Sequence, residues 1–179
     1  DQEESVFLDN DYAFFDHLTV YLIGPDKETV AHWELGDLKP FDQRPVSERG
    51  FVVPLTLAPK TNYTIYTRVD GAEALFIFQH LWQEDEFTRY SHQEHLVIGL
   101  FYGAILVMLL YNLLLYASTG EMAYLLYCVY LAMHALFLFA YRGFGFEYLW
   151  PDSPDFHAIS LNVLMPVTHA TLALFAQSY

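Results

Sequence analysis

The sequence has few basic residues, one cysteine and none of the common catalytic motifs. Its 8 Lys and Arg stand against 22 Asp and Glu, which gives a formal net charge of −14. The lack of a basic patch argues against nucleic acid as a partner. The single Cys128 excludes an internal disulfide and a cysteine-based zinc site. No GxSxG, HExxH, phosphate-binding glycine loop or EF-hand spacing is present. We therefore expect no enzyme activity, no metal and no cofactor in this chain.

Charge is distributed unevenly along the chain, although 54% of its residues are hydrophobic. Residues 1–95 carry 18 acidic and 7 basic residues, whereas residues 96–179 carry 4 acidic residues and one basic residue, Arg142. This predicts a soluble acidic half followed by a membrane half. Because the chain begins without Met and ends directly after an apolar run, we expect it to be a fragment of a longer protein.

Three apolar runs in the second half are candidates for membrane-spanning helices, at about 96–117, 122–141 and 157–177. The first run has 22 residues without a charge, or about 33 Å of helix, which is enough to cross the hydrocarbon core. A buried helix of a soluble protein is the alternative, but such a helix would normally carry a charged face. The loops at 118–121 and 142–156 contain too few basic residues to fix the orientation.

Small and polar residues within these spans indicate helix packing. Gly99 and Gly103 form a GxxxG pattern that lets a second helix approach closely, and Asn112 needs a hydrogen-bond partner at membrane depth. His134 and His169 also lie at membrane depth, and interhelical hydrogen bonds are the simpler interpretation for them. A sharper alternative is that these two histidines bind haem or a metal ion.

Residues 1–83 alternate apolar and polar side chains, as half-buried β-strands do. The predicted strands are 18–23, 31–35, 51–57, 63–69 and 74–78. Pro54 favours an edge position or a bulge for the third of them. Short strands at this spacing predict a β-sandwich or jelly roll rather than a βαβ fold.

The linker 84–95 is the connection between the two halves. His92, Glu94 and His95 could bind a surface metal, but a solvated linker is the simpler interpretation. Since the segment has neither Gly nor Pro, it could also continue as a helix into the first span. A stiff connection of that kind would carry a tilt or rotation of the soluble half into the membrane.

Two ordered sets of residues resemble a known family. The first set is Asn10, Phe15-Asp16-His17-Leu18, Tyr21, Gly36-Asp37-Leu38-Lys39-Pro40-Phe41, Arg44-Pro45, Phe51, Pro54-Leu55, Tyr66 and Arg68-Val69. The second set is Gly99, Tyr102-Gly103, Tyr111-Asn112-Leu113, Tyr124-Leu125-Leu126-Tyr127 and Tyr148-Leu149-Trp150-Pro151. In this order they resemble the type 2 extracellular domain, followed by the membrane domain, of bacterial seven-transmembrane receptors with diverse intracellular signalling modules (7TMR-DISM).

The resemblance implies a sensory receptor in the bacterial inner membrane. Residues 1–83 would form a periplasmic jelly roll that binds a small-molecule ligand, thought to be carbohydrate-like. Residues 96–179 would be the first three of seven membrane helices, with residues 1–95 and loop 142–156 outside and loop 118–121 inside. A histidine kinase or diguanylate cyclase would follow in the cytoplasm. Partners would be this ligand, the lipid bilayer and, as for many receptors, a second copy in a homodimer.

Four polar residues of the soluble half are candidate ligand contacts. Asp37 could accept hydrogen bonds from sugar hydroxyls, and Arg44 could donate a pair of them to a carboxylate or diol. Tyr66 and Arg68 share one strand face and could stack on a sugar. The alternatives are a structural Asp–Arg pair or turn cap, and side chains that only cover the sheet. A periplasmic protein-interaction module without a small ligand also fits these residues.

Overall fold

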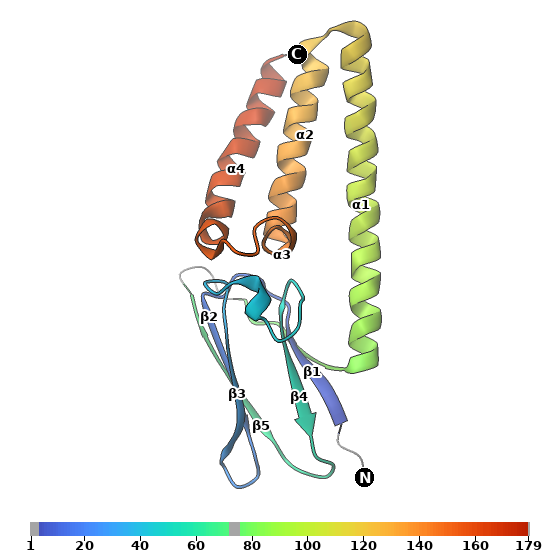
Figure 1. Ribbon diagram of the computed structural model, residues 1–179. Helices are drawn as coiled ribbons and strands as arrows, with labels where there is room; N and C mark the ends of the chain where they lie inside the picture. The colour runs from blue at the N-terminus through green and yellow to red at the C-terminus, as the bar shows by residue number, and fades with distance from the viewer. Residues whose placement is uncertain (1–3, 72–75, 179) are drawn as a thin grey trace.

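The computed structural model describes residues 4–71 and 76–178, which form a β-sandwich followed by long helices (Figure 1). Six strands are present in these described residues: β1 Glu4–Asn10, β2 His17–Ile23, β3 Thr29–Leu35, β4 Phe51–Leu57, β5 Thr64–Asp70 and β6 Gln79–Gln83. The helices are α1 Glu84–Thr119, α2 Met122–Tyr141, α3 Phe144–Tyr148 and α4 Pro154–Gln177, with a 3-10 turn at Phe41–Gln43. The predicted β-sandwich and three long apolar helices are confirmed.

The sandwich consists of two antiparallel sheets with strand orders β4-β1-β6 and β3-β2-β5. Strand β4 is an edge strand, as predicted from Pro54, which lies opposite Phe7 of β1. A proline is tolerated there because the outer side of an edge strand needs no ladder donor.

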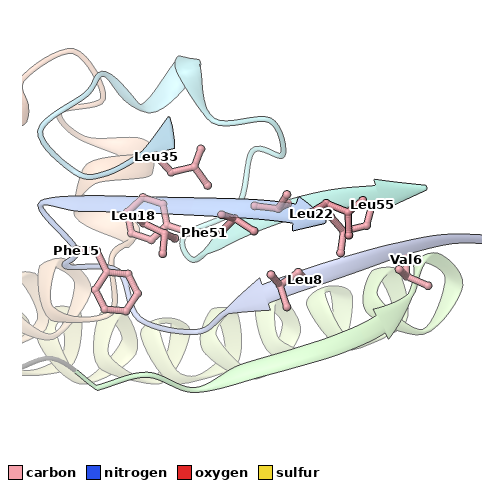
Figure 2. Close-up of a cluster of buried hydrophobic side chains, with 10 residues drawn as sticks. Val6, Leu8, Phe15, Leu18, Leu22, Leu35, Phe51 and Leu55 are labelled. Atoms are coloured by element: carbon pink, nitrogen blue, oxygen red, sulfur yellow. The ribbon is translucent and has the colours of Figure 1, made fainter. Parts of the chain in front are cut away.

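The core lies between the two sheets and is entirely apolar (Figure 2). Its buried members are Val6, Leu8, Phe15, Leu18, Val20, Leu22, Leu35, Phe51, Val53 and Leu55. Eight of them come from alternate positions of β1, β2 and β4, whereas Phe15 precedes β2 and Leu35 ends β3. Burying each large side chain contributes roughly 1.5–3 kcal/mol, which makes this layer the main source of the domain's stability.

The last predicted strand, 74–78, is wrong where it can be compared. Residues 74 and 75 lie outside the described part, and Phe76, Ile77 and Phe78 are not in a strand and are more than half exposed. The strand is instead β6, Gln79–Gln83, which pairs with β1. Pairing with β1 decides where this strand lies, although residues 76–78 are the more hydrophobic ones. The pairing supplies hydrogen bonds to the strand's backbone groups.

The segment 84–95 is not a solvated linker but the first three turns of α1. The helix starts directly after β6 and runs 36 residues, about 54 Å, to the left-handed cap at Gly120 (φ 72°). Residues 84–95, called here the α1 foot, lie against the sandwich, and Phe87 and Ser91 are buried there. The stiff connection considered from the sequence is therefore present.

Helices α1, α2 and α4 are each long and apolar enough to cross a membrane. Helix α2 packs against both α1 and α4 (Figure 1). The α1–α2 turn lies at the end far from the sandwich, whereas α3 and the start of α4 lie next to it (Figure 1). Residues 142–157, called here the α3–α4 corner, thus meet the sandwich at the surface of the membrane-spanning part.

Candidate functional site

The α1 foot is held on the outer face of the β4-β1-β6 sheet by aromatic packing. The ring of Phe87 meets Phe7 edge-on at 5.3 Å, and Tyr90 stacks on Trp82 at 5.1 Å. The hydroxyl of Ser91 donates to the Glu48 carboxylate at 2.7 Å. Because β1 is covered by the core on one face and by the foot on the other, sheet and helix move together.

Arg49 connects three segments of the chain at the edge of this contact. Its Nη2 lies 2.6 Å from Oε1 of Glu94 on the foot and 2.6 Å from Oδ1 of Asp11 after β1, and its Nε donates to Glu94 Oε2 at 3.3 Å. The Arg49 side chain is only 11% exposed. Burial alone would lower the pKa of Arg49, but the hydrogen bonds and charges of Glu94 and Asp11 outweigh it and raise this pKa. The guanidinium is therefore a fixed charge between sandwich and helix.

A second contact joins the sandwich to the α3–α4 corner through His157. The imidazole lies between Phe14 of the sandwich, at 5.2 Å, and Phe146 of α3, at 4.3 Å, nearly parallel to both rings. Its Nε2 lies 3.9 Å from Oδ2 of Asp37, and the Trp150 indole N–H donates to its Nδ1 at 3.5 Å. The side chain of His157 is 0% exposed, so this stack is a closed part of the interface.

Arg44 organises the loop that faces this corner. Its Nη1 donates to the carbonyls of Glu48, Arg49 and Gly50 at 2.8–3.2 Å, while its guanidinium carbon lies 4.3 Å from the ring centre of Phe51. It also lies 5.6 Å from the ring of Phe146 in α3. Burial lowers the pKa of Arg44 to about 10, and the Asp37 and Glu147 carboxylates oppose this shift. The side chain thus links the sandwich core to the corner.

The approach at the corner is close enough to require glycine. Gly143 has a φ of 86°, and a Cβ there would lie 2.8 Å from Cβ of Ala13 in the sandwich. The backbone N–H of Phe41 donates to the carbonyl of Pro151 at 3.0 Å across the same interface. A side chain at position 143 would therefore strain the backbone and push the two parts away from each other.

The structure divides the four predicted ligand contacts between two places. Asp37 and Arg44 are at the corner, where Asp37 is 4% exposed. Tyr66 and Arg68 lie on the outer face of the β3-β2-β5 sheet, where both are exposed. Arg68 lines an open groove of about 350 Å³ with His17, Thr19, Glu34, Leu35, Lys39 and Asp70. Ligand binding by all four residues stays a prediction.

The predicted packing residues of the first span lie on different faces of α1. The face of α1 that packs on α2 is marked by Tyr102, which was not among the predicted packing residues; its ring lies 5.3 Å from that of Phe139. A Cβ on Gly99 or Gly103 would meet no described atom within 4 Å, so this face is open towards the surroundings. Asn112 donates to the carbonyl of Met108 within its own helix at 2.8 Å. Packing of a further helix on the two glycines stays a prediction.

His134 and His169 line the same small cavity between α2 and α4. The cavity measures about 120 Å³ and also includes Tyr130, Met165 and Thr168. Nδ1 of His169 lies 2.7 Å from the carbonyl of Met165 in the preceding turn. Among the described residues no group of three His, Cys, Asp or Glu side chains could hold a metal ion. Two imidazoles alone do not complete the three or four ligands that a protein metal site needs.

Sequence analysis did not predict the two contacts themselves, and it did not single out Arg49 or His157. Arg49 and Glu94 are 45 positions apart, and no periodic pattern relates them. Phe144 and Phe146 are both 1% exposed and pack against the sandwich. Arg44 and Asp37 were found from the sequence, through the pattern that resembles the family.

The two buried contacts define a membrane protein whose β-sandwich is seated on helices long and apolar enough to span the bilayer. The 7TMR-DISM extracellular 2 domain matches residues 1–83, and the 7TM diverse intracellular signalling domain matches residues 94–179. The chain belongs to the 7TMR-DISM family. No curated protein and no solved structure matches it.

Proposed function

We propose that this chain is the ligand-sensing and transmitting part of a receptor in the bacterial inner membrane. The sandwich lies in the periplasm and binds a small, carbohydrate-like molecule. The helices pass the binding event to a histidine kinase or diguanylate cyclase in the cytoplasm. The observation that carries this proposal is the double attachment of the sandwich, through Arg49 to α1 and through His157 to α4.

The ligand binds in the groove next to Arg68 on the β3-β2-β5 sheet. Arg68 and Lys39 supply donors, Glu34 and Asp70 supply acceptors, and exposed Tyr66 offers a ring on the same strand face as Arg68. Paired donors and acceptors in an open groove fit a polyhydroxylated molecule, because each sugar hydroxyl both donates and accepts. The ion pair of Arg68 with Asp70 is long, 3.9 Å, and exposed, so a ligand can replace it at low cost.

This proposal keeps Tyr66 and Arg68 as the predicted ligand contacts and gives Asp37 and Arg44 a role in transmission instead. Lys39 donates to the carbonyl of Glu34 at 3.0 Å, and both residues line the ligand groove. Lys39 is two residues from Asp37, which faces His157 at the corner. Ligand binding at Lys39 therefore changes the loop that holds Asp37 and Arg44. A displacement of this loop shifts α4 relative to α1, which Arg49 holds on the other sheet.

A thermal-shift screen of the full chain in lipid nanodiscs tests the proposal. The screen covers neutral sugars, uronic acids, amino acids and divalent cations. A ligand at a hundred times its Kd should stabilise the fold by about 2.7 kcal/mol. We expect a hit that Arg68→Ala and Tyr66→Ala abolish, whereas Asp37→Asn retains binding. Arg89→Ala, at an exposed position on the α1 foot, is the charge-matched control.

Two other functions have their own tests. The second candidate is a haem- or metal-binding membrane protein, for which His134 and His169 line one cavity but no third His, Cys, Asp or Glu ligand joins them among the described residues. It predicts a Soret band or bound metal in the purified protein that is lost in His134→Ala and His169→Ala. A periplasmic protein-interaction module would instead give a folded sandwich with no small-molecule hit.

A further inference from the structure

An amphipathic groove lies between α1 and α2. It measures about 430 Å³, and Val97, Ile98, Phe101 and Leu138 form its apolar walls. Arg142 and Gln93 line the same groove one turn nearer the sandwich. One end is thus apolar and the other polar, over roughly one to two helical turns.

The polar end carries a positive charge without a protein partner in the described residues. Arg142 is the single Lys or Arg in residues 96–179, and no ion pair joins it to a described carboxylate. Glu94 lines the groove too, but its carboxylate is bound by Arg49. The groove therefore selects for an anionic group at this end.

The polar end lies at the level of the membrane surface. Arg142 directly follows the apolar run of α2, and Gln93 and Glu94 precede the uncharged run of α1 that begins at Leu96. Tyr141 and Tyr148 are each 58% exposed at the same end of the helices, as expected for aromatic residues at a membrane interface. The apolar walls then lie in the hydrocarbon layer.

We propose that this groove binds a glycerophospholipid with an anionic head group. The phosphate pairs with Arg142 and accepts a hydrogen bond from Gln93, while one acyl chain lies along Val97, Phe101 and Leu138. A further membrane helix in the groove would leave the charge of Arg142 without a counter-ion, unless that helix carried an Asp or Glu at this level. A free anion would leave the apolar walls unused. A bilayer lipid supplies both parts of the match at once.

Native mass spectrometry of the full chain in detergent, titrated with phosphatidylglycerol, tests the proposal. Phosphatidylcholine is the neutral comparison, and inorganic phosphate is the competitor. We expect Arg142→Gln to weaken phosphatidylglycerol binding about tenfold and Arg142→Lys to retain most of it. Val97→Trp fills the apolar walls and should also weaken it. The matched controls are Arg89→Gln and Val107→Trp, which change exposed positions outside the groove.

Each outcome has one meaning. Loss of binding in both Arg142→Gln and Val97→Trp, with both controls unchanged and inorganic phosphate unable to compete, supports the lipid. Loss in Arg142→Gln alone, or displacement by inorganic phosphate, shows a free-anion site and overturns the proposal. Equal binding of phosphatidylcholine overturns the proposal as well. So does phosphatidylglycerol binding that is unchanged in Arg142→Gln or in Val97→Trp.

Discussion

Replacing Arg49 by Gln should detach the α1 foot from the sandwich. The substitution removes the charge that joins Glu94 and Asp11, whose side chains are 19% and 37% exposed. Removing one partner of a fully buried ion pair costs about 3–5 kcal/mol, because the remaining charge is left without compensation. Since Asp11 can turn to water, we expect a smaller loss of about 2–3 kcal/mol in the free energy of unfolding.

A double-mutant cycle separates the ion pair from other effects of the change. Urea unfolding of the full chain in detergent gives the stability of Arg49→Gln, Glu94→Gln and the double variant. We expect a coupling of about 1–2 kcal/mol between the two sites and faster amide exchange over residues 84–95. The exposed pair Arg68–Asp70 is the control, and Arg68→Gln should change little. A coupling near zero, with unchanged exchange in the foot, would refute the assigned role of Arg49.

Three further predictions concern single side chains. Burial, with a smaller effect of Asp11, raises the pKa of Asp9 from 3.8 to about 6. The folded state thus favours the protonated acid, and stability should fall as pH rises from about 4 to 6. Asp9→Asn should remove this dependence and add about 1–2 kcal/mol above pH 6, as measured by urea midpoints; an unchanged pH profile contradicts it. Gly143→Ala should cost about 1–3 kcal/mol and expose the corner to exchange, whereas Gly103→Ala, in open space, should not; equal effects would show that the corner is loose. Phe146→Ala should cost about 3–5 kcal/mol by calorimetry, because the ring is 1% exposed and stacks on His157; a loss below about 1 kcal/mol would contradict the buried stack.

The elements that sequence analysis found are those with one buried face or with a long run of apolar residues. Strand β2 has the core on one face and an open outer face, so Leu18, Val20 and Leu22 alternate with less buried residues. The spans are long and predominantly apolar, so hydropathy alone reveals them. Strand β1 was missed because both of its faces are covered: Val6 and Leu8 point into the core, and Phe7 packs on Phe87. Apolar and polar side chains therefore do not alternate clearly along β1.

The contacts of the site depend on tertiary structure. Asp37 and Arg44 were recognised as special from their family pattern, but their orientation towards His157 follows from how the corner seats on the sandwich. The pairing of Arg49 with Glu94 requires the foot to be helical and docked. Neither feature produces a local pattern in the sequence, because each joins segments far apart along the chain.

The measurement that tests the central claim most directly is the distance distribution between the sandwich and the far end of α1. Spin labels at Asp42 and Ser118, in a Cys128→Ser background in nanodiscs, report it by pulsed electron resonance. Rigid seating through Arg49 and His157 predicts a narrow distribution that broadens in Arg49→Gln and in Phe146→Ala. A broad distribution in the otherwise unchanged chain would contradict the claim that sandwich and helices move as one body.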